Sequence, residues 1–113
     1  MSDQKVKFIS KEGLFEMMEN KENFKLVEVL AEVDYETGHI PFAINIPVNK
    51  LAELAPAILP DKNQCVVVYC SDFLCTASTG AARFLQSMGY KYILDYKGGK
   101  QDWNNAGLPL IKS

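Results

Sequence analysis

Hydrophobic residues occur in this chain either as short unbroken runs or as stripes at helical spacing. The clearest run, Val66 to Tyr69, is apolar and mostly β-branched, as in a strand buried on both faces of a parallel sheet. Cys70 and then six mixed residues follow it, and next comes a helical stripe that Gly89 is placed to end. The members of the stripe are Ala77, Ala81, Phe84, Leu85 and Met88. This stretch therefore predicts a strand, a loop and a helix in direct succession.

The rest of the chain continues the alternation of strands and helices. Further strands are expected at residues 6–9, 24–30, 43–46 and 92–95, and further helices at residues 11–20, 32–37, 50–59 and 101–105. Alternating strands and helices predict an α/β fold around a mainly parallel sheet, in a single domain spanning residues 1–113.

Local signals mark where two of these helices begin and end. Ser10 is placed to cap the first helix, and Pro56 is expected to interrupt the helix at 50–59 before Pro60 stops it. The buried face of the first helix is expected to comprise Leu14, Phe15, Met17 and Met18.

Composition and charge narrow the classes of function. The 113 residues carry a net charge of −2 and a single arginine, Arg83, which argues against the clustered basic patch of a nucleic-acid-binding protein. No apolar run approaches the length of a membrane span, and the polar residues 1–7 lack the apolar core of a secretory signal. We therefore expect a cytoplasmic protein that binds neither nucleic acid nor membrane. Three cysteines and one histidine, without paired C-x-x-C spacing, predict neither a disulfide framework nor a metal site.

Cys70 stands where the central strand ends and the loop begins. The reactive form of cysteine is the thiolate, and an ordinary cysteine is mostly protonated at neutral pH. Free N–H groups at the start of a helix, and in a loop that curls back, stabilise a nearby anion and lower the pKa of a thiol. Ligand sites of parallel sheets also lie beyond the carboxyl ends of the strands. Position alone leaves two readings of Cys70 open, a reactive thiol and a buried structural cysteine.

Three segments of the chain resemble a known family, in that family's order. They are VVVYC with its loop and AARFLQSMGY, GHIPFAINIP at residues 38–47, and YKGGKQDWNNAGLP at residues 96–109. Together they are similar to the single-domain rhodaneses, which are sulfurtransferases, over roughly residues 6–110. The resemblance implies a rhodanese-like α/β fold with about five mainly parallel strands and helices on both faces. It also implies that Cys70 is the catalytic nucleophile, with no metal or organic cofactor.

The loop after Cys70 departs from the arginine-bearing loop that is common in this family. It is about two residues longer and has no basic residue, which weakens the case for thiosulfate because an arginine fork is the natural binder of such an anion. Phe73 and Leu74 favour instead a neutral polysulfide, a persulfide carrier or a protein partner, whereas Asp72 could orient an acceptor thiol or repel an anionic donor. Without an arginine five residues after Cys70, phosphatase and arsenate reductase chemistry is rejected. The expected active-site and substrate-binding loop comprises Ser71, Asp72, Phe73, Leu74, Cys75 and Thr76.

Two further cysteines need an interpretation. Cys75 is either a resolving thiol, which attacks a persulfide or sulfenate on Cys70, or a loop cysteine packed under the start of the helix. Cys65 begins the same strand that Cys70 follows, so it is expected at the opposite edge of the sheet, away from the chemistry.

Positive charge near Cys70 is the remaining candidate feature. Lys97 follows a predicted strand, and Lys97 or Lys100 is a candidate for supplying the missing positive potential, against the alternative of a solvated lysine. His39 is structural in the family. Leu30 and Phe42 stand where the family usually has an arginine and a glycine.

Three functions follow from these observations. The first is a sulfurtransferase that moves sulfane sulfur from thiosulfate, polysulfide or a persulfide donor to a thiol or cyanide through a Cys70 persulfide, with a sulfur-carrier protein as a possible partner. The second is a non-catalytic rhodanese-like binding or regulatory module. The third is a thiol redox protein that uses Cys70 and Cys75.

Overall fold

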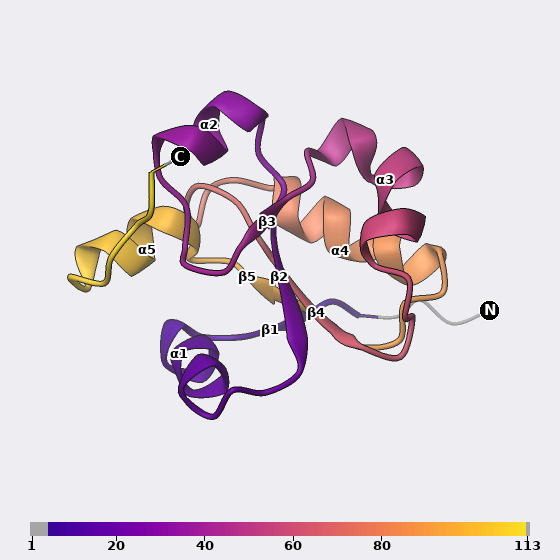
Figure 1. The fold of residues 1–113 in the computed structure, drawn as a ribbon, viewed down its shortest axis with the longest axis horizontal. Coiled ribbons are helices and arrows are strands. Elements are labelled where there is room, and N and C mark those ends of the chain that lie inside the picture. Colours follow the sequence, from indigo (N-terminus) through magenta and orange to yellow (C-terminus); the bar gives the residue numbers. More distant parts are fainter. Residues whose placement is uncertain (1–4, 113) are drawn as a thin grey trace.

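The computed structural model describes residues 5–112 and has a five-stranded parallel sheet between two layers of helices (Figure 1). Residues 1–4, part of the polar segment that supports the cytoplasmic expectation, and residue 113 lie outside the described residues. In chain order the elements are β1 (Lys7–Phe8), α1 (Lys11–Glu19), β2 (Phe24–Glu28), α2 (Glu32–Thr37), β3 (Ile44–Asn45), the 3-10 helix η1 (Val48–Lys50), α3 (Leu51–Ile58), β4 (Cys65–Tyr69), α4 (Ala77–Ser87), β5 (Ile93–Tyr96) and α5 (Gly99–Asn105).

The strands lie in the order β1-β5-β4-β2-β3, so β4 is the central strand. In its register with its neighbours, Tyr69 pairs with Glu28 of β2 and with Tyr96 of β5. Because all these pairs are parallel, the residues that follow the three strands meet at one edge of the sheet. This carboxyl edge receives Cys70 from the centre and Lys97 from the neighbouring strand.

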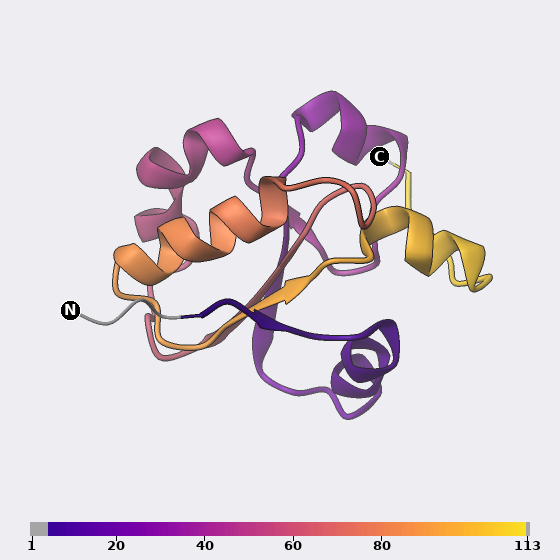
Figure 2. The same ribbon diagram turned by 180° about the vertical axis from the view of Figure 1, so that it is seen from behind.

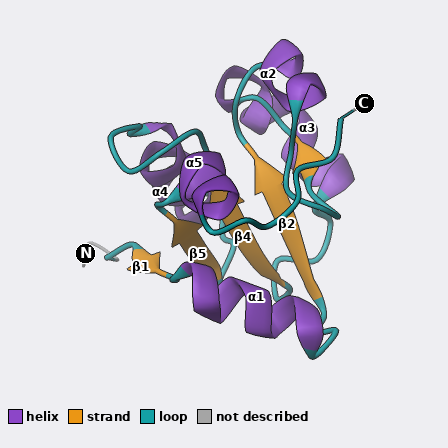
Figure 3. Cartoon of the chain, turned by 90° about the vertical axis from the view of Figure 1, so that its left-hand side faces the viewer, coloured by secondary structure: helices purple, strands orange, loops and turns teal. Residues whose placement is uncertain are grey.

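Helices cover both faces of the sheet, as predicted, and the alternation of side chains in β4 assigns them. Val66 and Val68 are wholly buried in a core with residues of α3 and α4, whereas Val67 and Tyr69 face a second core with α1 and α5. Figure 3 shows α1 and α5 in front of the strands and α4 behind them. Complete burial of a valine side chain contributes roughly 1.5–3 kcal/mol, and this is why the β-branched run specifies the central strand.

The structure confirms the predicted elements and shifts several of their ends by one or two residues. Ser10 caps α1, because its hydroxyl accepts a hydrogen bond from the Gly13 amide at 3.0 Å. Two predicted core positions are wrong. Phe15 is 41% exposed and Phe84 is 40% exposed, because each lies at the border of its helix's buried face. The buried positions of α4 are the predicted Ala81 and Leu85, together with Ser78 and Ala82.

The predicted interruption at Pro56 is also wrong, since α3 continues through it. Proline removes its own N–H from the helix and its ring crowds the carbonyl of Ala52, which loses its usual partner. Both residues lie on the exposed side of α3, where water can satisfy that carbonyl. Within residues 5–112, no helix combines the length and the apolar character that crossing a membrane requires.

Candidate active site

Cys70 lies at the carboxyl edge of the central strand, with its side chain wholly buried. Its Sγ lies 3.6 Å from the Ser78 hydroxyl oxygen, and its thiol donates to the Cys75 carbonyl oxygen at 3.7 Å. Ser78 is in the first turn of α4, and its backbone amide also bonds to the Cys70 sulfur. The start of α4 is therefore aimed at Cys70, as the strand–loop–helix pattern predicts.

The electrostatic balance at Cys70 nevertheless favours the protonated thiol. Burial raises the pKa of Cys70 above its ordinary value, and its hydrogen bond to Cys75 raises it further. The bonds from the hydroxyl and amide of Ser78 lower this pKa without outweighing the burial. The resting site thus holds Cys70 as a thiol with anion-stabilising donors already in place.

Cys75 is the more readily ionised of the two loop thiols. It is half-buried, and burial alone would raise its pKa. Hydrogen bonding with Cys70, with the Ala77 amide and with Ser71 outweighs this and lowers the pKa of Cys75 below its ordinary value. The loop therefore brings Cys70 and Cys75 into contact at the start of α4, a juxtaposition that sequence spacing left open.

Asp72 braces the loop from within. Its carboxylate oxygen Oδ1 accepts from the backbone amides of Leu74 at 3.0 Å and Cys75 at 3.1 Å, and its carbonyl also accepts from the Cys75 amide at 3.1 Å. Such an Asx turn is a common way for aspartate to shape a loop. Two of the loop amides that were expected to stabilise an anion at Cys70 are thus bound to Asp72 instead.

The tip of the loop is apolar and open. Phe73 is 62% exposed and Leu74 is 90% exposed, so two apolar side chains project from the loop into solvent. On one side of the loop, Phe73 lines a surface groove with Phe8 and Lys97, and on the other side Ser71 and Asp72 line a second groove with residues that include Leu30 and Lys100. Thr76 is exposed and caps α4 through its backbone carbonyl, which accepts from the Gly80 amide at 3.1 Å.

The two candidate lysines do different things. Lys97 follows β5, one position past the pair Tyr69–Tyr96, so it lies beside Cys70, and its ammonium donates to the Cys75 carbonyl. That carbonyl is also the acceptor of the Cys70 thiol. Lys100 instead forms a buried ion pair with Glu28, with its Nζ 3.0 Å from Oε2. Lys97 is therefore the lysine that brings positive charge to the loop.

The start of α5 fixes the backbone of Cys70. The amide of Lys100 donates to the Cys70 carbonyl at 3.1 Å, and the amide of Gln101 donates to the Ser71 carbonyl at 2.9 Å. In Figure 2 the loop between β4 and α4 lies beside the first turn of α5. Sequence reasoning missed Ser78 and Gly99 as site residues. The doublet Gly98-Gly99 was the available signal, because glycines mark places of close backbone approach.

The remaining sequence candidates lie away from the sulfur atoms. His39 is buried and stacks on the Tyr35 ring at 3.8 Å between centroids, which agrees with a structural role. Cys65 is at the opposite end of β4, as expected. Among residues 5–112, no cluster of three or more histidine, cysteine, aspartate or glutamate side chains is arranged to hold a metal ion.

Comparison with known proteins places this geometry in context. The family model described as rhodanese-like domain matches residues 10–106. The chain is 34% identical to the thiosulfate sulfurtransferase PspE of Escherichia coli, over 76% of this chain and 77% of that protein. It is also 34% identical to an HTH-type transcriptional regulator of Mycobacterium tuberculosis, over 75% of this chain, but it spans only 36% of the regulator's length. A solved rhodanese-related protein from Thermoplasma volcanium superimposes with a TM-score of 0.79 at 25% identity, covering 96% of this chain and 100% of that one.

Proposed function

The chain belongs to the rhodanese-like domain family, and from this premise we propose that it is a sulfurtransferase that carries sulfane sulfur on Cys70. Sulfur transfer is the activity named for the related PspE, whereas the related regulator shows that such domains also occur in proteins of other function. The observation that carries the proposal is the position of the Cys70 thiol, at the carboxyl edge of the central strand and against the start of α4.

Catalysis would proceed in two half-reactions. The Cys70 thiolate attacks the outer sulfur of the donor, a new S–S bond forms at Cys70, and the donor's own bond to that sulfur breaks. The bonding electrons leave with the departing thiolate or sulfite. An acceptor thiolate then attacks the outer sulfur of the persulfide, and Cys70 departs as a thiolate. The amide and hydroxyl of Ser78 support the negative charge on Cys70 at both stages.

The loop favours donors that need little cationic recognition. Its six residues contain no basic side chain, and Lys97 offers a single ammonium rather than a bidentate arginine fork. Exposed Phe73 and Leu74 offer an apolar rim to a polysulfide chain or to a protein that carries a persulfide. We therefore rank polysulfides and persulfides above thiosulfate as donors, with a small thiol or a sulfur-carrier protein as the acceptor.

Initial-rate kinetics test this mechanism. Varying the donor at several acceptor concentrations should give the parallel double-reciprocal lines of a ping-pong reaction. Cys70→Ser should abolish turnover, and Cys65→Ser, at the far end of the same strand, should leave turnover unchanged. Intersecting lines, or full activity of Cys70→Ser, would contradict a persulfide on Cys70.

The position of Cys70 against Cys75, with the Cys70 sulfur 3.7 Å from the Cys75 carbonyl oxygen, favours a second candidate function, a thiol redox protein. An oxidant such as hydrogen peroxide would take two electrons and two protons from the pair and leave a Cys70–Cys75 disulfide. The mass should then fall by two hydrogens, and dithiothreitol should restore it. Oxidation that reaches one thiol and leaves the other free would exclude this function.

A further inference from the structure

Access to the two loop sulfurs is unequal. The Cys70 side chain is wholly buried under the loop, whereas Cys75 is only partly buried at the edge of the same core. The loop is closed over Cys70 by the Asp72 brace and by the bond from Lys97 to the Cys75 carbonyl. A donor approaching from solvent therefore meets Cys75 before it can meet Cys70.

We propose that Cys75 is the entry thiol of the site, which takes the sulfane sulfur from the donor and passes it to Cys70. This inference rests on the proposed function and adds a second catalytic residue to it. It differs from a resolving role, in which Cys75 attacks the inner sulfur of a Cys70 persulfide and closes a disulfide.

The relay consists of two displacements that balance in atoms and electrons. In the first, the Cys75 thiolate attacks the outer sulfur of a persulfide or polysulfide, an S–S bond forms at Cys75, and the donor leaves as a thiolate. In the second, the Cys70 sulfur attacks the outer sulfur of the Cys75 persulfide, the S–S bond at Cys75 breaks, and the Cys70 proton moves to the Cys75 sulfur. No net oxidation or reduction occurs, and the products are a Cys70 persulfide and a Cys75 thiol.

The hydrogen bonding of the pair suits this direction of transfer. The Cys70 thiol donates to the backbone carbonyl of Cys75 at 3.7 Å, so its proton already lies beside the residue that receives it. In sulfur exchange, a thiol of lower pKa leaves faster, and a thiol of higher pKa is intrinsically the stronger nucleophile. The pKa of Cys75 is lowered and that of Cys70 is raised, so sulfur passes readily from Cys75 to the buried Cys70.

Time-resolved mass spectrometry with polysulfide tests the relay, using peptide mapping to locate the added sulfur. The native chain, Cys75→Ser, Cys75→Ala, Cys70→Ser and the control Cys65→Ser are compared, with circular dichroism reporting the fold of each. The relay predicts that Cys70→Ser still gains one sulfur, on Cys75. It also predicts that both Cys75 variants load Cys70 at least ten-fold more slowly than the native chain does. Iodoacetamide at pH 7 should modify Cys75 before Cys70 in the native chain, a readout that needs no variant.

Three results would overturn the relay. One is loading of Cys70 at the native rate in folded Cys75→Ser or Cys75→Ala. Another is a Cys70→Ser chain that gains no sulfur while the native chain does, which would leave the proposed function intact. The third is a native chain that loses two hydrogens and releases hydrogen sulfide, which would make Cys75 a resolving thiol. A native chain that never gains sulfur would instead remove the proposed function together with the relay.

Discussion

Gly99 packs so closely against Cys70 that a Cβ at Gly99 would lie 2.5 Å from the Cys70 carbonyl oxygen. Gly99 also adopts a φ of +64°, in the left-handed region that favours glycine. It opens α5, whose first amides bond to the Cys70 and Ser71 carbonyls. The position of Cys70 is therefore set partly by a helix that begins 29 residues further along the chain.

Replacing Gly99 should harm both stability and sulfur loading. Gly99→Ala adds left-handed strain and a backbone clash, so we expect a loss of at least about 2 kcal/mol in the free energy of unfolding. Gly107→Ala is the matched control, because Gly107 has a φ of +79° but no heavy atom within 4 Å of an added Cβ. It should cost only about 1 kcal/mol and leave loading of Cys70 unchanged. If both variants lose the same free energy of unfolding in urea, the close packing of Gly99 against Cys70 has no energetic consequence and the prediction is wrong.

The buried pair Glu28–Lys100 predicts a pH dependence of stability. Glu28 is wholly buried, and burial raises its pKa above 4.5, against the hydrogen bond from Tyr69 and the ion pair with Lys100, which lower it. Between the unfolded and folded pKa values, the folded state binds more protons than the unfolded state does. Glu28 therefore makes the native chain lose stability as pH rises from about 4.5, by up to about 1.4 kcal/mol per pH unit, until its folded pKa is passed.

Urea unfolding of the native chain and Glu28→Gln at several pH values measures this contribution. The free energy of unfolding of the native chain minus that of Glu28→Gln should fall as the pH rises and then level off. Lys100→Met removes a charge that lowers the pKa of Glu28, so it should extend the fall to higher pH. A difference that is flat or rises with pH would show that the folded state does not raise the pKa of Glu28.

The negative charge of Asp72 predicts that its removal favours anionic sulfur donors. Asp72→Asn retains an Oδ1 that can accept from the Leu74 and Cys75 amides, but it removes a negative charge beside the thiols. Loading from thiosulfate should rise by about five-fold, on the order of 1 kcal/mol for a dianion about 8 Å from the carboxylate at an effective dielectric constant near 80. Alkylation of Cys75 by neutral iodoacetamide serves as the control and should change less than two-fold. If both rates change equally, Asp72 acts on loop shape rather than on donor charge.

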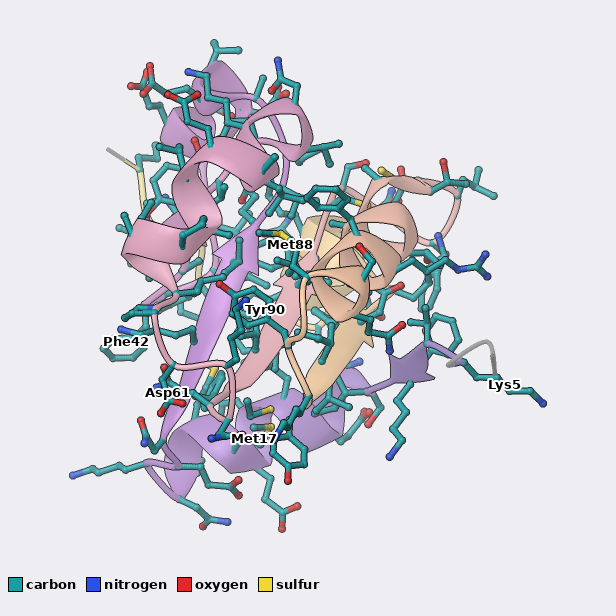
Figure 4. The ribbon with its side chains drawn as sticks, turned by 90° about the vertical axis from the view of Figure 1, so that its right-hand side faces the viewer. Lys5, Met17, Phe42, Asp61, Met88 and Tyr90 are labelled. Atoms are coloured by element: carbon teal, nitrogen blue, oxygen red, sulfur yellow. The ribbon has the colours of Figure 1, made fainter. Side chains whose placement is uncertain are left out.

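The backbone conformation of Phe42 predicts that glycine at this position is more stable than alanine. It has a φ of +72° and is 86% exposed, and Figure 4 shows its ring projecting from the surface. Because a non-glycine residue is strained in this region, Phe42→Gly should be about 1 kcal/mol more stable than Phe42→Ala. The alanine variant is the matched control, since it removes the ring and retains the strain. Equal unfolding midpoints for the two variants would contradict strain at this position.

The sequence predicted those features that depend on neighbours in the chain. The run Val66 to Tyr69 specified the central strand, and its alternation specified a core on each face. Cys70 followed as the residue at the carboxyl edge, and the start of the helix at Ala77 followed from the apolar stripe. Both features depend on local periodicity, which a single sequence displays directly.

Features that depend on distant contacts were not predictable in this way. The burial that raises the pKa of Cys70 arises from closure of the loop, and the pairing of Lys100 with Glu28 joins residues from α5 and β2. The contact between Cys70 and Cys75 depends on the Asx turn at Asp72, which no apolar periodicity reveals. Spacing alone therefore left the role of Cys75 open.

The most direct test of the central claim is the intact mass of the protein after treatment with polysulfide or thiosulfate, followed by addition of a thiol. The native chain and Cys65→Ser should each gain one sulfur, mapped to Cys70, and lose it to the thiol. The double variant Cys70→Ser/Cys75→Ser should gain none. A native chain that gains no sulfur from either donor, or a double variant that gains as much as the native chain, would contradict sulfur transfer at this site.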